Sequence, residues 1–282
     1  MCITCGCGTN SAHIVNREHQ HNHSHGNHTG EAHSHDHHHA HVSLYNHDHS
    51  HTHNEMGHQN TESRMIHLEK DILHENALLA SRNRGYLDAK GILAINLVSS
   101  PGSGKTMLLE RTLTDLKEEL SFSVIEGDQQ STVDADRIEA TGTKAVQINT
   151  GKGCHLDAHM VLHAIQEIKP LENSLLFIEN VGNLVCPSMF DLGENERVVI
   201  ISVTEGDDKP LKYPDMFHTS GICIINKIDL LPYVPFDCDK LIENAKKINP
   251  NLIFFRVSCT TGEGLNSWYD WLRERSAVLR NE

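Results

Sequence analysis

The first 60 residues of this 282-residue chain contain no lysine, a single arginine and a single aromatic residue. Such a segment cannot bury enough apolar surface to offset the entropy that it would lose on ordering. The same segment holds 17 of the 23 histidines. We therefore predict two regions: a Cys/His-rich tail over residues 1–60 that is disordered until it binds something, and a folded domain over residues 61–282.

Positive charge is scarce in both regions. The tail has five acidic residues against one basic residue, and the rest of the chain has 33 against 23. Because an acidic surface repels a phosphate backbone, we expect no nucleic-acid partner.

Long apolar runs are also missing. No run approaches the roughly 18 apolar residues of a membrane span, and the opening MCITCGCG lacks the basic and apolar parts of a secretory signal. We expect no membrane association and a cytoplasmic location, where thiols stay reduced. The eight cysteines are then metal ligands or small buried residues rather than disulfides.

Histidine dominates what the tail does contain, as in HSHDHHHAH at 33–41. Neutral imidazole is a ligand for zinc, nickel and copper, so a flexible tract of this kind can hold several ions. An expression tag is the alternative. Tags are usually uninterrupted runs, whereas here Ser, Asn, Asp and Thr separate the histidines between His13 and His58. We favour a native metal-binding or storage tract.

A separate thiol motif, C-x-x-C-G-C, precedes the histidines at Cys2, Cys5 and Cys7. Thiolates bind soft and borderline metals strongly, and Gly6 lets the backbone turn tightly around an ion. The alternative is a redox C-x-x-C pair, which usually opens a helix in a thioredoxin-like unit, and no such unit is evident. We favour a metal site tighter than any histidine cluster.

The domain begins with a predicted lead-in helix. Met65, Leu68, Ile72 and Leu79 lie on one helical stripe, which Leu73 and Leu78 support. The stretch SRNRG at 81–85 suggests that this helix ends at Gly85.

Apolar strands alternate with helical stretches after this point. The strands are predicted at 92–98, 122–126, 144–148, 174–178, 197–203, 221–225 and 252–257, and the helices near 105–119, 132–140, 155–168, 237–247 and 265–279. This alternation predicts an α/β fold, a mostly parallel sheet covered by helices on both faces.

The first predicted strand runs into SSPGSGKTMLL at 99–109, the context of a phosphate-binding loop. Lys105 can reach the β- and γ-phosphates, and the Thr106 hydroxyl can bind magnesium. One position departs from G-x-x-x-x-G-K-[ST], because Ser99 stands where the first glycine is usual. Backbone N–H groups that can point at phosphate oxygens belong to Gly102, Ser103, Gly104, Lys105 and Thr106.

The motif N-K-x-D in INKIDL at 225–230 favours GTP over ATP. The Asp229 carboxylate can accept the paired N–H groups of guanine, which adenine lacks, and the Lys227 stem can lie on the base. Asn226 is expected to tie this loop to the phosphate loop. The segment SCTTGEG at 258–264 can cover the base from the other side.

Two acidic residues that follow strands are candidate magnesium ligands. Glu179, in FIENVGN at 177–183, stands where a Walker-B acid would be, and Gly182 stands where the γ-phosphate would be sensed. Asp128, in IEGDQQSTVDADRI at 125–138, is the second candidate, in the segment expected to switch. Ordinary solvation of loop acids is the alternative for both. No residue can be named as the group that orients the attacking water.

A second metal site is suggested by Cys154, His155 and Cys186, which follow strands expected to end at the nucleotide edge. Buried structural cysteines are the alternative. His159 and His163 share a helix face with His155 and can assist, although solvated helix histidines are the simpler interpretation. Among the other cysteines, Cys223 and Cys259 are expected in the core, and Cys238 fits neither role.

Together these motifs resemble the HypB family of hydrogenase nickel incorporation proteins. The resemblance rests on CITCGCG at 2–8, the histidine tract, LVSSPGSGKT at 97–106, EGDQQ at 126–130, GKGCHLDAHM at 151–160, IENVGNLVCP at 178–187 and NKIDL at 226–230. It covers almost the whole chain, and Ser99 belongs to the family pattern.

The resemblance implies a slow, regulatory P-loop GTPase of the signal-recognition/MinD-like class that inserts nickel into nickel–iron hydrogenase. It implies GTP or GDP with Mg²⁺, tight Ni²⁺ binding at Cys2, Cys5 and Cys7, and Zn²⁺ or Ni²⁺ at Cys154, His155 and Cys186. The implied partners are a GTP-dependent second copy of the chain, a HypA-like nickel and zinc protein, the hydrogenase large subunit and a SlyD-like chaperone.

Two other functions compete with this one. A urease-type accessory GTPase would lack the N-terminal cysteines and carry Cys-Pro-His, whereas here Cys186 and Pro187 are followed by Ser188. A metal-storage buffer with a vestigial nucleotide domain would not need Lys105, Thr106, Glu179 and Asp229 intact.

Overall fold

The computed structural model describes residues 13–15, 56–129 and 133–279. The predicted thiol motif and most of the histidine tract lie outside the described residues. The chain divides into two units, Met1–Asn16 with His67–Glu282, and Arg17–Ile66. The fold and the sites below belong to the first unit.

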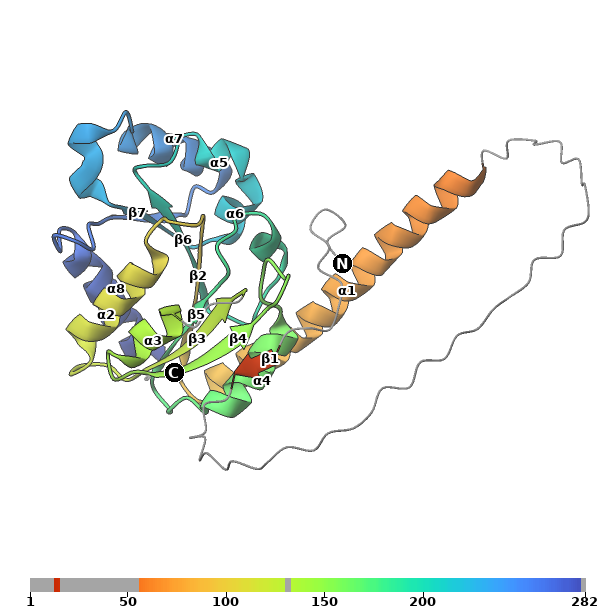
Figure 1. The fold of residues 1–282 in the computed structure, drawn as a ribbon, viewed down its shortest axis with the longest axis horizontal. Helices are drawn as coiled ribbons and strands as arrows, with labels where there is room; N and C mark the ends of the chain where they lie inside the picture. The colour runs from red at the N-terminus through yellow and green to blue at the C-terminus, as the bar shows by residue number, and fades with distance from the viewer. Residues whose placement is uncertain (1–12, 16–55, 130–132, 280–282) are drawn as a thin grey trace, which may run out of the picture. The chain divides into compact units, whose positions relative to one another are not determined.

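Eight described strands form one sheet in the order β1-β4-β3-β5-β2-β6-β7-β8 (Figure 1). The strands are β1 (His13–Val15), β2 (Leu93–Ser99), β3 (Phe122–Asp128), β4 (Lys144–Asn149), β5 (Leu175–Glu179), β6 (Glu196–Ser202), β7 (Ile222–Asn226) and β8 (Ile253–Arg256). The seven strands from β2 onward pair in parallel, which confirms the predicted sheet. Their residues are mostly apolar because both faces of the sheet are covered.

Helices cover the two faces in three apolar clusters. On one face, α2 (Lys105–Leu116) and α8 (Leu265–Leu279) pack on the alternate residues Leu93, Ile95 and Leu97 of β2. On the other face, α1 (Met56–Ala89) and α4 (Ala158–Ile168) form one cluster, and α6 (Pro214–Thr219) and α7 (Cys238–Ile248) form another. The remaining described helices are α3 (Val133–Glu139), α5 (Lys209–Lys212), η1 (Cys186–Met189) and η2 (Ile228–Tyr233).

The predicted helices are confirmed, but the lead-in helix differs from its prediction. It does not end at Gly85; it continues to Ala89, and Gly91, at φ 60°, makes the turn into β2. The interior glycine costs only about 1 kcal/mol of helix propensity, whereas continuation buries Leu87 completely.

The buried face of α1 was also only partly predicted. Leu73 and Leu78 are exposed, and two buried asparagines, Asn76 and Asn83, occupy the packed stripe with Ala80. The Asn83 amide donates to the carbonyls of Ala158 and Leu192 at 2.9 and 3.0 Å. A search for apolar residues at helical spacing does not predict such polar contacts.

One short strand lies within residues 1–60, the segment that the sequence predicts to be a disordered tail. His13–Val15 forms β1, which pairs antiparallel with β4 at the sheet edge. An edge strand leaves backbone donors and acceptors open, so even three residues can add to it. The short helices α5, α6, η1 and η2 were not predicted either.

Parallel strands place their carboxyl ends at one edge of the sheet. The segments that follow β2, β3, β5 and β7 therefore meet there, which is where ligands bind in open α/β sheets. No helix among the described residues is long and apolar enough to cross a membrane.

Candidate functional site: a phosphate loop beside a thiol–imidazole cluster

The phosphate loop links β2 to α2 through two glycines with positive φ. Gly102 has φ 75° and Gly104 has φ 92°, where other residues would be strained. A Cβ on Gly104 would also lie 2.5 Å from Nδ2 of Asn226. These backbone angles turn the chain into the N-terminus of α2, where N–H groups attract anions.

Side chains from two other loops hold this loop in place. Asn226 donates from Nδ2 to the Ser103 carbonyl at 2.9 Å, which is the predicted tie between the guanine motif and the loop. The Lys227 ammonium donates to the Gly102 carbonyl at 2.7 Å. Lys209, which no motif predicted, donates to Oγ of Ser100 at 3.2 Å.

Lys105 and Thr106 converge on Glu179. The Lys105 ammonium forms an ion pair with Oε1 of Glu179, and Oγ1 of Thr106 donates to the same oxygen at 2.6 Å. Glu179 is fully buried. A phosphate or a magnesium ion would compete with these contacts, because each binds the same groups.

Glu126 is a functional candidate that no sequence motif indicates. Strand register places it directly beside Glu179. It is 2% exposed, and neither Oε2 of Glu126 nor Oε2 of Glu179 receives a hydrogen bond from a described residue outside the pair. Two paired carboxylates with open oxygens suit a magnesium ion.

The two carboxyls have opposite pKa shifts. Burial and the charge of Glu179 raise the pKa of Glu126 well above its usual range. Burial also raises the pKa of Glu179, but the Lys105 ammonium and the hydrogen bonds from Glu126, Lys105 and Thr106 outweigh it, so this pKa is lowered. Glu126 therefore holds a proton more tightly than Glu179 does.

A cavity of about 510 Å³ lies over this group and is lined by the phosphate loop, the end of β3 and residues 180–182. The predicted magnesium ligand Asp128 and the predicted sensor Gly182 both line it. Asp134 and Arg137 of α3 line it too. Arg137 is held by Glu110 at 2.6 Å, which connects α3 to α2.

The guanine motif is at the same edge. Asp229 lies in η2. This helix begins directly after Lys227, whose φ of 63° makes the turn. Cys259, which precedes Thr260 in the predicted covering segment, donates from Sγ to Oδ1 of Asn226 at 3.3 Å. Burial raises the pKa of this thiol to about 11, so it stays protonated and can donate.

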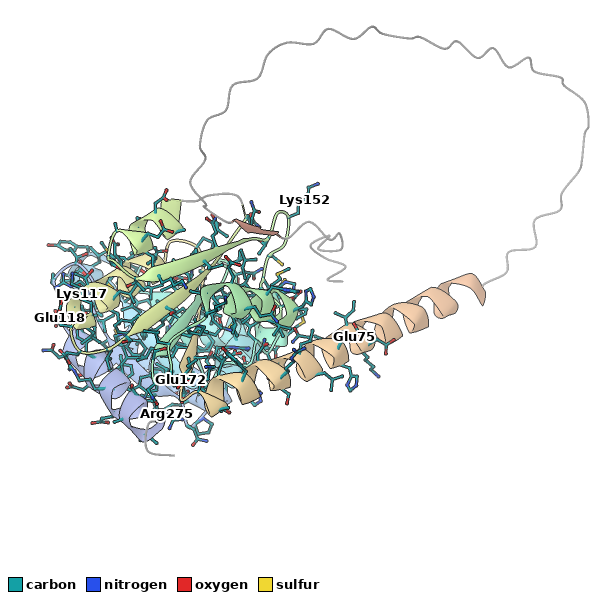
Figure 2. All side chains as sticks on the ribbon, turned by 90° about the horizontal axis from the view of Figure 1, so that it is seen from below. Glu75, Lys117, Glu118, Lys152, Glu172 and Arg275 are labelled. Atoms are coloured by element: carbon teal, nitrogen blue, oxygen red, sulfur yellow. The ribbon has the colours of Figure 1, made fainter. Side chains whose placement is uncertain are left out.

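Cys154, His155 and Cys186 come together although two loops carry them. Their ligand atoms all lie within 4.8 Å of one another. The His155 ring stacks on Phe190 with centroids 4.0 Å apart, and burial lowers its pKa, which favours the neutral form that binds metals. Figure 2 shows Lys152 standing out from the loop that carries Cys154 and His155.

The remaining predicted side chains are placed as follows. His159 and His163 are exposed on α4, with their Nε2 atoms 3.2 Å apart. Cys223 and Cys259 are buried, as predicted, and Cys238, for which neither role was expected, is buried at the start of α7. Its position on the apolar face of that helix was not evident from the isolated sequence.

Comparisons with known proteins place these features in a family. The CobW/HypB/UreG nucleotide-binding domain matches residues 93–256. The hydrogenase maturation factor HypB of Rhizobium leguminosarum bv. viciae is 58% identical over 220 residues, covering 78% of this chain and 73% of that protein. HypB of Escherichia coli strain K12 is 45% identical over 284 residues, covering 96% and 98% of the two chains.

A solved structure agrees with these sequence matches. The crystal structure of HypB from Helicobacter pylori in complex with nickel aligns with a TM-score of 0.68 and 40% identity, over 72% of this chain and 96% of that one. With its P-loop GTPase fold and its CobW/HypB/UreG nucleotide-binding domain, the chain belongs to the HypB family of hydrogenase maturation factors.

Proposed function

We propose that this protein is a GTP-hydrolysing nickel metallochaperone, which stores nickel and assists its insertion into nickel–iron hydrogenase. One observation carries the proposal: a phosphate loop, a guanine motif and a three-ligand thiol–imidazole cluster are positioned by the same edge of one sheet. The segment after β5 serves both sites, since Glu179 ends that strand and Cys186 follows seven residues later.

GTP would bind with its phosphates on the loop at 99–106 and its base against Asp229. Lys105 would bridge to the β- and γ-phosphates, while Asn226 and Lys227 keep the loop in shape. Thr106, Glu179, Glu126 and Asp128 are the residues that would hold Mg²⁺, which supplies charge neutralisation at the phosphates. Gly182 would adjoin the γ-phosphate. Turnover would be slow, as in regulatory GTPases.

Nickel, the cargo, would bind at three kinds of site. Cys154, His155 and Cys186 supply two thiolates and an imidazole, a borderline donor set that also accepts zinc. Cys2, Cys5 and Cys7 would form a tighter site, and the histidine tract would hold a reserve of weakly bound ions.

The partners follow from the same proposal. A second copy of the chain would dock when GTP is bound, next to Cys186, where Val185 and Met189 are exposed by 54% and 46%. A HypA-like nickel and zinc protein, the hydrogenase large subunit and a SlyD-like chaperone would exchange or receive metal. We place this work in the cytoplasm, where the thiols stay reduced.

Parallel assays of GTP hydrolysis and nickel binding test the proposal on full-length protein. Wild type should release phosphate from GTP and not from ATP. The double variant Cys154→Ser, Cys186→Ser should lose one nickel site, and Cys238→Ser should keep it as the matched thiol control. The triple variant Cys2→Ala, Cys5→Ala, Cys7→Ala should lose the tightest site.

A metal buffer with a vestigial nucleotide domain would give a different result. Wild type and Lys105→Ala would then be equally inert toward GTP, while nickel binding persisted. That outcome would refute the GTPase part of the proposal and leave the storage part standing.

A further inference from the structure

The side chain of Asn180 touches both candidate sites. Asn180 follows Glu179, is completely buried and lines the nucleotide cavity. Its Oδ1 accepts a hydrogen bond from the backbone N–H of Leu156 at 3.2 Å. Because Leu156 is the residue after His155, one amide joins the cavity wall to the backbone of the metal-cluster loop.

The same amide begins a second connection through the interior of the sheet. Its Nδ2 donates to Oδ1 of Asn96 on β2 at 3.3 Å, and Asn96 donates in turn to Oε1 of Glu194 at 3.0 Å. Arg197 on β6 donates to Glu194 from Nε and Nη2 at 3.0 and 2.8 Å. We call Asn180, Asn96, Glu194 and Arg197 the amide–arginine chain.

The far end of the amide–arginine chain holds the other metal-cluster segment. Arg197 donates to the carbonyls of Ser188 and Phe190 at 3.2 and 2.8 Å. Ser188 follows Cys186 by two residues, and the Phe190 ring stacks on His155. The amide–arginine chain therefore contacts the metal-cluster segments at two points. Asn180 meets the residue after His155, and Arg197 meets the residues that follow Cys186.

This chain crosses a region that is otherwise apolar. Asn96 lies on β2 between Ala94 and Val98, which belong to the two separate apolar clusters of that sheet face. All four side chains of the amide–arginine chain are at least nine-tenths buried. Breaking a buried hydrogen bond leaves a polar group without a partner, which costs free energy. When one end of the amide–arginine chain moves, the other side chains of that chain therefore adjust so that their hydrogen bonds are kept.

We propose that Asn180 is a positioning residue that couples the nucleotide cavity to the metal cluster. A γ-phosphate presses on the segment 180–182, and Asn180 passes that displacement to the Leu156 N–H and, through the amide–arginine chain, to Phe190. Nickel affinity at Cys154, His155 and Cys186 thereby depends on which nucleotide is bound. The inference rests on the proposed GTP and nickel binding, and it adds the residues that connect them.

The test measures nickel affinity with GDP and with a non-hydrolysable GTP analogue. It uses the full chain carrying Cys2→Ala, Cys5→Ala and Cys7→Ala, so that nickel–thiolate absorption reports Cys154 and Cys186 rather than tail imidazoles. The reference chain should show a ratio of the two dissociation constants of about tenfold, within the usual range of coupling. The ratio is the decisive readout, since a purely structural defect would lower both affinities together.

Asn180→Ala should bring the ratio to within about twofold of unity. Glu194→Gln, which lines neither site and keeps the shape of the side chain, should reduce it while both ligands still bind, and it carries the test if Asn180→Ala does not fold. Asn249→Ala is the matched control, because the Asn249 amide holds the carbonyls of Phe217 and Ser220 away from both sites. It should keep the full ratio.

Three results would overturn the inference. Folded Asn180→Ala and Glu194→Gln proteins that keep the full ratio would show that the coupling runs elsewhere. A reference chain that binds nickel and both nucleotides with a ratio of one would refute coupling but leave the proposed function intact. A reference chain that binds neither ligand would refute the proposed function and, with it, this inference.

Discussion

Two buried polar groups lie on opposite faces of the same sheet, and they differ in how completely they are hydrogen-bonded. The first group lies next to α2 and consists of Lys105, Glu179 and Glu126. Among the described residues, Oε2 of Glu126 and Oε2 of Glu179 receive no hydrogen bond from outside this pair of carboxyls. The amide–arginine chain forms the second. Every described buried polar atom of its four side chains has a partner.

The difference separates a binding site from a connecting element. Burying polar atoms without partners costs free energy, so the open oxygens of the carboxylate pair are best explained by a ligand that completes them. The fully bonded chain needs no ligand and instead resists local deformation. Substitutions in the first group should therefore change chemistry, and those in the second should change stability and coupling.

The largest expected effect is on stability, in the second group. Glu194→Ala leaves the Arg197 guanidinium buried and unpaired, and should lower the free energy of unfolding by about 3–5 kcal/mol. Urea unfolding followed by the fluorescence of the buried Trp268 measures this change. Glu172→Ala, which removes an exposed carboxylate, should change it by less than about 1 kcal/mol. Similar losses in both variants would contradict the contrast between the two groups.

The next effect is on catalysis, in the first group. Lys105→Ala should lower the turnover number for GTP by about 10²–10³-fold, because a fixed positive charge at the transferring phosphate is lost. Because the variant also leaves the buried Glu179 carboxylate without its cation, its free energy of unfolding should fall too, so turnover is measured under conditions where circular dichroism shows that the variant is folded. Lys117→Ala, a lysine just beyond α2 that Figure 2 shows on the surface, is the control. Wild-type turnover in Lys105→Ala would exclude Lys105 from the reaction.

Glu126→Gln should have a smaller effect on GTP hydrolysis, which should appear in the magnesium requirement. The magnesium concentration for half-maximal GTP hydrolysis should rise by about 10-fold, if Glu126 completes the ion's environment. Glu118→Gln, an exposed carboxylate also labelled in Figure 2, should leave it unchanged. An unchanged magnesium requirement in Glu126→Gln would leave Glu126 as a purely structural acid.

The same variant should change the dependence of stability on pH. The folded-state pKa of Glu126 is raised by burial and by Glu179, so wild type should lose stability as the pH rises above about 4.3, the ordinary value for glutamate. Glutamine cannot ionise, and this loss should be smaller in Glu126→Gln. Urea unfolding at several pH values measures it, and parallel curves for the two proteins would contradict the raised pKa.

The smallest effect concerns the surface attachment of α1. Hydrogen bonds from Arg84 and Gly193 outweigh burial and lower the pKa of Asp191. The contribution of Asp191 to the free energy of unfolding is therefore fully present above about pH 4 and is lost as the pH falls through the folded-state pKa. Asp191→Asn should cost at most about 1 kcal/mol at pH 7, since the pair is partly exposed. Glu75→Gln on the same helix is the control, and an equal loss in both would remove Asp191 from the attachment.

Much of the fold followed from patterns within short segments. The seven parallel strands and five helices were predicted within a few residues, because apolar runs and helical periodicity are local properties of the chain. The exceptions have specific causes. The stretch SRNRG predicts a helix end at Gly85, but Leu87 is buried beyond it. Strand β1 depends on an edge that only the assembled sheet provides.

The sequence by itself determined the phosphate loop and the guanine motif, because each is a contiguous motif whose chemistry is carried by residue type. It also named Cys154, His155 and Cys186 as candidate ligands, but only the fold brings their two segments together. Only the tertiary structure decided that Glu126 stands beside Glu179, since β3 and β5 are neighbours through a crossover. It likewise decided that Asn180 reaches both Leu156 and Asn96, which are 24 and 84 residues away along the chain. Hydrogen bonds between distant segments depend on sheet register and packing, and no local pattern encodes those.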